Sequence, residues 1–262
     1  MACSPNTKME LPISCQLDPR LGLFRITRAK GKTLSSGGFG VAISTENVAS
    51  CEENTPTGDR AVIDKLLQTT HQYLFIEEVL FLHERGLLEC KQASSSELLD
   101  TSQLYQLLPP LQLSLPIYFV YAHLRSQDFR VLRHSTSRIE VLRKHDATGV
   151  PDSKLKEFKR TIRKTLEKAP PPIIPGNGLE ICFDVYMPNA SFSKLNPGLP
   201  DFLVATTYYS ESRVSFVDCQ KILERCEGIR LKVATVSDSG TVVMFGLTNF
   251  GVPVCETNQE LH

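Results

Sequence analysis

The stretch that most constrains the fold is 229–250, near the C-terminus, which reads as strand, acidic turn and strand. Its first part alternates apolar residues with Arg230 and Lys232, the pattern of a strand with one buried face. Residues 241–247 are almost wholly apolar or β-branched, as expected of a strand covered on both faces or paired with another chain. Ser-Asp-Ser-Gly at 237–240 supplies the turn. We therefore expect this stretch to complete an interface as well as a core.

The composition is that of a globular protein. The chain has 262 residues, 41% of them hydrophobic, and a formal net charge of zero, which excludes a uniformly basic nucleic-acid binder but allows a local basic face. None of the 8 cysteines has CxxC or zinc-ligand spacing, so we expect no metal, no cofactor and a reducing compartment. The N-terminus lacks a secretory signal, and no apolar run could span a membrane.

Residues 1–110 are expected to form an N-terminal mixed α/β domain that ends at Pro109-Pro110. We predict loose order at 1–20, a strand at 21–28, a turn at 35–38, a loop at 43–59, and helices at 61–68 and 74–88. The Ser-Ser-Gly-Gly turn is not a phosphate loop, because no GK[ST] follows it. Glu77 and Glu78 are interpreted as a solvated helix start rather than as catalytic acids.

Residues 111–262 are expected to form a second domain. It opens with a helix at 115–127, with Pro116 in its first turn, and a strand at 129–132. Five cationic residues around this strand are expected to form a rim: Arg125, Arg130, Arg133, His134 and Arg138.

A basic, proline-rich insertion is predicted at about 137–178. One interpretation is a solvated, partly disordered linker. The other is an arm that contacts RNA phosphates, which needs positive charge but no exact geometry. Its candidate RNA-binding residues are Lys159, Arg160, Arg163 and Lys164. Phe158 is the only aromatic residue among these charges, so base stacking is not indicated.

After the insertion, the alternation of residues 179–186 predicts a strand, and two further strands are expected at 202–208 and 214–217. Asp218 is expected to cap a helix, and its apolar face is Cys219, Ile222, Leu223 and Cys226. The predicted fold class is therefore α+β, in which the N-terminal mixed α/β domain is followed by a small α/β sheet domain.

Several strings resemble segments of the tRNA-splicing endonuclease family, in the family's order. YLFIEEVLFL at 73–82 is similar to its Y-x-x-x-EEA-x-x-L segment, and 115–133 resembles the helix and strand that open its nuclease-like domain. FDVY at 183–186 is similar to its DF-x-V-Y strand, and 231–247 resembles its final strand, acidic loop and strand. The resemblance spans most of 70–250, is greatest to the larger structural subunit, and implies an endonuclease-like C-terminal domain.

Catalytic members of that family use a Tyr, a His and a Lys, because attack of a ribose 2′-OH on the adjacent phosphate needs a base, an acid and a cation. Tyr186 matches the tyrosine position, and Lys232 lies within a residue of the lysine position. The segment expected to hold the histidine reads NPGLPD at 196–201; His134 and His145 lie outside it. The resemblance thus implies a non-catalytic subunit with degenerate family positions. The alternative is an active endoribonuclease that uses Tyr186, Lys232 and a histidine from elsewhere.

The resemblance also implies partners and a location. The chain would scaffold the catalytic subunits of a heterotetramer and position precursor tRNA for intron removal, in the nucleus or also in the cytoplasm. The expected partner contacts are Thr241, Val243, Phe245 and Leu247 on the last strand, and Asp238, which would enter a basic pocket of the opposite heterodimer. An ordinary turn role for Asp238, and an adaptor unrelated to RNA that shares only the fold, are the alternatives.

Overall fold

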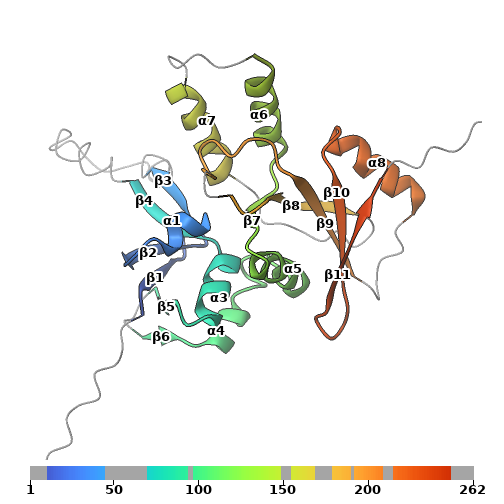
Figure 1. The fold of residues 1–262 in the computed structure, drawn as a ribbon. Coiled ribbons are helices and arrows are strands. Elements are labelled where there is room, and N and C mark those ends of the chain that lie inside the picture. Colours follow the sequence, from blue (N-terminus) through green and yellow to red (C-terminus); the bar gives the residue numbers. More distant parts are fainter. Residues whose placement is uncertain are drawn as a thin grey trace, which may run out of the picture.

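The computed structural model describes residues 11–44, 70–93, 97–148, 155–168, 179–189, 192–208 and 215–248. It contains helices and two sheets, in agreement with the predicted α+β class. The two sheets lie side by side, with helices α3 and α5 between them (Figure 1). Within the described residues, no helix is long and apolar enough to cross a membrane.

The N-terminal sheet has six strands in the order β3-β4-β2-β1-β5-β6. Their bounds are β1 Ile13–Asp18, β2 Leu23–Ala29, β3 Val41–Ser44, β4 Thr70–Leu74, β5 Leu88–Lys91 and β6 Leu98–Leu99. The predicted strand at 21–28 is confirmed as β2. Loose order at 1–20 is wrong for β1, because this strand lies between β2 and β5 with Ile13 and Cys15 fully buried.

The helices of this half are α1 Thr33–Gly37, α3 Ile76–Glu84 and α4 Thr101–Gln106. The turn predicted at 35–38 is the end of α1, which stops at Gly38 in the left-handed conformation at φ 67°. The central part of the helix predicted at 74–88 is confirmed as α3. The first and last residues of the predicted range belong instead to β4 and β5. The predicted helix at 61–68 and most of the loop at 43–59 lie outside the described residues.

The C-terminal sheet has five strands in the order β11-β10-β9-β8-β7. Their bounds are β7 Arg130–Arg133, β8 Glu180–Tyr186, β9 Phe202–Tyr208, β10 Leu231–Val236 and β11 Val242–Leu247. Helix α5, Leu115–Ser126, confirms the helix predicted at 115–127 and packs on one face of this sheet. Helix α8, Phe216–Cys226, covers the other face through Ile222 and Cys226.

A strand predicted at 214–217 is wrong, because α8 begins at Phe216. Ser215, not Asp218, is the N-cap residue: its hydroxyl accepts a hydrogen bond from the Asp218 N–H at 3.1 Å. The Asp218 carboxylate accepts the Ser215 N–H in return, which completes a capping box.

Replacing Ser215 by Ala is expected to lower the free energy of unfolding by about 1 kcal/mol, because the first turn of α8 loses its acceptor. Lys221→Ala, at an exposed position of the same helix, should change it by less than about 0.5 kcal/mol. Urea denaturation of both variants measures the difference. Equal effects in the two variants would contradict the capping role.

The predicted insertion contains two helices, α6 Thr136–Thr148 and α7 Leu155–Glu167. Helix α7 packs against α6 and β3 and buries Phe158, Ile162 and Leu166, one residue per turn. A solvated linker is therefore wrong for these helices, whereas 169–178 lies outside the described residues.

One apolar cluster connects the two sheets. It runs from Ile13 and Leu88 of the first sheet, through α3 and α5, to Phe183 and Ala234 of the second. The expected boundary at residue 110 falls between α4 and α5. The division into two domains stays a prediction.

Candidate functional site

The position that the resemblance assigns to catalysis lies beside a polar pocket of about 440 Å³ at the end of β8. Helix α6 contributes Leu142, His145 and Asp146, and the rest comes from the end of β8 and the loop before β9. The remaining lining residues are Tyr186, Met187, Asn189, Phe192, Asn196, Pro197, Gly198, Leu199 and Asp201.

Tyr186 does not offer its hydroxyl to this pocket. The residue is 3% exposed, its ring packs 5.1 Å from that of Phe192, and its buried oxygen has no hydrogen-bond partner among the described residues. Burial, and then the charge of Asp184, raises its pKa far above the usual value, against the opposing effect of Arg138. A neutral, covered phenol of this kind is a packing group rather than a base.

Lys232 and Tyr186 point to opposite faces of the sheet. Val185 lies opposite Phe202 in the β8–β9 pair, and Lys232 lies opposite Val204 in the β9–β10 pair. Because successive residues alternate between faces and opposed residues share one, Lys232 shares the face of Phe202, and Tyr186 takes the other. Accordingly, Lys232 Nζ lies 4.1 Å from the centroid of the Phe202 ring.

A shift of one residue in the lysine position would not restore the pair. Leu231 and Val233 flank Lys232 and point to the face of Tyr186, but both are buried apolar residues. The structure therefore brings together neither the predicted Tyr–Lys pair nor a substitute for it on β10.

The sequence did not indicate His145, whose ring stacks on Phe158 with a centroid distance of 4.1 Å. The sequence carries no signal for this placement, because α6 and the loop at 196–201 are about 50 residues apart and meet only in the folded chain. The other lining groups oppose phosphate binding: Asp146 and Asp201 are carboxylates, and the described lining contains no Lys or Arg. Such a pocket lacks the cation that the charge of a phosphorane requires.

The expected cationic rim is wrong for Arg133, His134 and Arg138, whose side chains are largely buried and paired with carboxylates. Arg138 is fully buried and binds Asp184, with 2.5 Å between Nη2 and Oδ2. His134 Nδ1 lies 2.6 Å from the other oxygen of Asp184. Arg138 also donates to the Arg133 carbonyl. These contacts connect α6 to β7 and β8 through one buried carboxylate.

Glu77 and Glu78 are buried as well, so their interpretation as a solvated helix start is wrong. Glu77 accepts two hydrogen bonds from Arg133, at 2.6 and 2.7 Å, in the bidentate geometry that favours Arg. The Arg133 guanidinium also lies 3.9 Å from the centroid of the Phe75 ring. This pair connects α3 to β7 and thus one sheet to the other.

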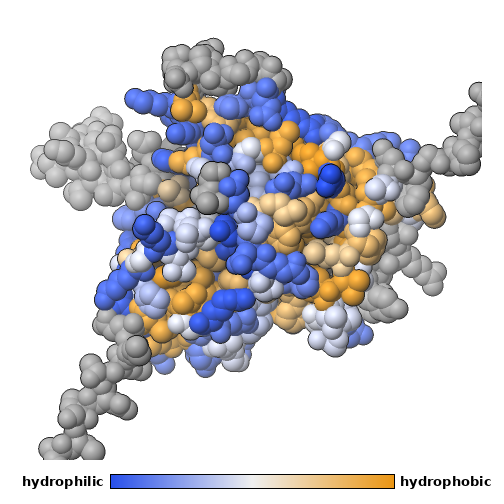
Figure 2. All heavy atoms as spheres, in the orientation of Figure 1, coloured by the Kyte–Doolittle hydropathy of each residue, from blue (hydrophilic) through white to orange (hydrophobic). Residues whose placement is uncertain are grey.

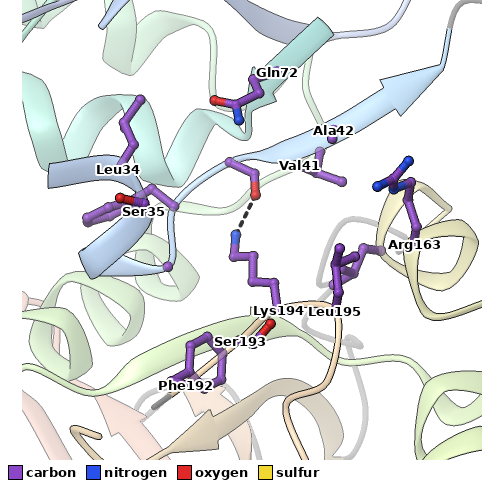
Figure 3. Close-up of a pocket in the computed structure, with 14 residues that line it drawn as sticks. Leu34, Ser35, Val41, Ala42, Gln72, Arg163, Phe192, Ser193, Lys194 and Leu195 are labelled. Carbon is purple, nitrogen blue, oxygen red and sulfur yellow. Dashed lines mark hydrogen bonds between the residues drawn. The ribbon is translucent and has the colours of Figure 1, made fainter. Parts of the chain in front are cut away.

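Glu78 and Lys194 connect the loop before β9 to the N-terminal sheet. Lys194 Nζ donates to the Gly40 carbonyl at 2.6 Å, as Figure 3 shows, and lies 3.4 Å from Glu78 Oε1. Glu78 also accepts the Gly40 and Phe75 N–H groups. Burial lowers the pKa of Lys194, and the charge of Glu78 opposes this shift. Lys194 and Glu78 therefore have a structural role, in which they hold the loop before β9 against the N-terminal sheet.

The basic residues of α7 are exposed, with the exception of Arg163. Lys159, Arg160 and Lys164 are exposed. Arg163 is half-buried and lines a pocket of about 280 Å³ between β3 and the loop at 192–195 (Figure 3). Their role in RNA binding stays a prediction.

The last strand, β11, is the outer strand of its sheet among the described residues. It begins at Val242, so Thr241 belongs to the turn, where its N–H donates to Ser237 Oγ at 3.1 Å. Val243 is 60% and Phe245 50% exposed, whereas Leu247 is buried. The strand is therefore not covered on both faces in this chain. Asp238 lies at the tip of the turn that precedes it.

Exposed apolar residues are concentrated on this part of the molecule. Phe216 and Val217 at the start of α8 are 79% and 58% exposed. Figure 2 shows apolar atoms on the right-hand side of the view, where α8, β10 and β11 lie in Figure 1. Exposed apolar side chains beside an open strand edge are typical of a surface that binds another protein.

No family model matches the chain, and no curated protein matches it either. Within the described residues, no group of three or more His, Cys, Asp or Glu residues is placed to hold a metal ion.

Proposed function

We propose that this protein is a non-catalytic structural subunit of a tRNA-splicing endonuclease complex. It would hold the catalytic subunits and help to position precursor tRNA for intron removal, in the nucleus. The observation that carries the proposal is the open edge of β11, with Val243 and Phe245 exposed on one face. Such an edge offers main-chain hydrogen bonds and an apolar contact to a strand of a partner subunit.

The non-catalytic part of the proposal is supported by the pocket at the end of β8. Tyr186 is covered, Lys232 lies on the other face of the sheet, and two carboxylates line the space where a phosphate would bind. Removal of a general acid or base alone typically lowers a rate by about 10²–10⁴-fold. This arrangement lacks the cation as well.

Co-expression tests the proposal. The chain, tagged, is expressed with the catalytic subunits of a tRNA-splicing endonuclease and purified, and the native complex is weighed by mass spectrometry. We expect a stoichiometric complex that cleaves precursor tRNA. A chain that stays monomeric in the presence of every catalytic subunit would exclude the proposed function.

Replacing Tyr186 by Phe in that complex is expected to change the cleavage rate by less than about twofold, because a covered phenol supplies no proton. A substitution of the catalytic subunit's own tyrosine is the matched control and should abolish cleavage. The measurement is the single-turnover rate of precursor tRNA cleavage.

One observation favours the alternative of an active endoribonuclease: His145 lines the same pocket as Tyr186. On that alternative, the purified chain alone would cleave precursor tRNA, and Tyr186→Phe would abolish the cleavage. We expect neither result.

A further inference from the structure

A basic hollow lies where the two halves of the chain meet on the side of α1, α3 and the turn between α5 and β7. It has a volume of about 630 Å³. Four cationic side chains line it, Lys32, Arg85, Arg125 and Arg130, with Asp128 as the single carboxylate of the described lining. The proposed function assigns no role to this surface.

Arg125 forms the floor of the hollow. It is 7% exposed, and its guanidinium lies 3.9 Å from the centroid of the Phe39 ring. Its Nη atoms donate to the carbonyls of Phe129 at 2.8 Å and Gly37 at 2.9 Å, while the buried Nε has no partner among the described residues. These neutral acceptors hold the group in place but leave its positive charge uncompensated.

Arg130 adds a second positive charge beside the first. Its Nη1 donates to the Asp128 carbonyl at 2.7 Å, and its buried Nε has no partner in the described part of the chain. Burial lowers the pKa of Arg130, the like charge of Arg125 lowers it further, and the charge of Asp128 opposes both effects. An anion in the hollow would relieve this repulsion, because it would lie close to both groups.

Lys32 and Arg85 lie at the rim and are exposed. The Arg85 guanidinium covers the Phe81 ring at 3.7 Å, and Arg125 covers Phe39. Both aromatic faces that could stack on a base are thus already occupied by guanidinium groups. The hollow therefore suits a phosphate and not a base.

We infer that this basic hollow binds the phosphate backbone of RNA. The cations are spread around an open depression rather than converging in a closed cage, which fits a polyanion that passes across the surface. The inference rests on the proposed function, and it places precursor tRNA against the junction of the two sheets rather than on α7 alone.

The test measures the affinity of the full chain for a labelled precursor tRNA by fluorescence anisotropy at several salt concentrations. Lys32→Gln combined with Arg85→Gln changes two exposed side chains and leaves the buried Arg125 intact. We expect about tenfold weaker binding, and a salt dependence that is shallower by about 0.7–0.9 for each lost contact. Circular dichroism and thermal unfolding confirm that the variant is folded.

The control carries the same change in net charge. Arg20→Gln with Lys221→Gln removes two exposed charges that do not line the hollow. The inference is overturned if this control weakens binding as much as the hollow variant does. It is also overturned if the hollow binds inorganic phosphate or a nucleotide while the affinity of the hollow variant for RNA is unchanged.

Co-purification with the catalytic subunits separates this inference from the proposed function. A hollow variant that assembles but binds RNA as well as the unaltered chain contradicts the hollow alone. A chain that joins no endonuclease subunit but loses RNA affinity in the hollow variant contradicts the proposed function alone.

Discussion

Replacing Asp184 by Asn is expected to lower the free energy of unfolding by about 3–5 kcal/mol, because it leaves a fully buried guanidinium without its counter-charge. Asp184 and Arg138 are both 0% exposed. Arg138 Nε and Nη1 already lack a partner among the described residues, and Asp184 is the carboxylate with which Arg138 forms an ion pair there. His134 would lose its carboxylate acceptor in the same substitution.

The matched control lies on the same strand. Glu180 pairs with Arg225 at 2.5 Å, but the side chains are 40% and 49% exposed. Glu180→Gln should therefore lower the free energy of unfolding by less than about 1 kcal/mol. Urea denaturation with a common m-value compares the two variants. A loss below about 1 kcal/mol for Asp184→Asn would contradict the view that this carboxylate holds α6 against the sheet.

The C-terminal sheet was largely predictable, because most of its strands can be recognised from the residue pattern of their own segment. Residues 179–186 alternate apolar with polar side chains, and 202–208 is a run of apolar and β-branched residues, so both segments indicate strands. Strand β1 carries the same signal in Ile13, Cys15 and Leu17, but the polar segment around it led to the prediction of loose order.

The buried charges were not predictable from the sequence. Asp184 meets Arg138 across 46 residues and His134 across 50. Glu77 meets Arg133 across 56. A charged residue is expected to be exposed to solvent unless its partner is known. Here each partner lies on another element of the fold.

Helix α7 illustrates a different difficulty. Phe158, Ile162 and Leu166 recur every four residues, which is a helical signal. Seven basic residues surround them between 154 and 168, and this charge favoured the linker interpretation. The candidate site was missed for a related reason: His145 reaches its pocket only through the packing of α6.

Replacing Val243 and Phe245 by Lys is expected to remove the chain from its complex with a catalytic subunit. Buried aromatic anchors of an interface typically contribute about 2 kcal/mol or more, so Phe245→Lys alone should weaken association by about 30-fold or more. Lysine on an edge strand also opposes pairing with another strand. Both side chains are at least half exposed in the chain alone, so the free energy of unfolding should change by less than about 0.5 kcal/mol.

Leu98→Lys is the control, because Leu98 is a 39% exposed apolar residue on β6, the outer strand of the other sheet. It adds the same charge as Phe245→Lys alone, at an edge to which the proposal assigns no partner. Co-purification and the dissociation constant from analytical ultracentrifugation compare the variants. If Leu98→Lys disrupts the complex and the β11 variants do not, the partner binds the N-terminal sheet. That result would contradict the proposed role of β11. Its exposed apolar edge would then need a different partner, because an uncovered apolar edge strand favours aggregation.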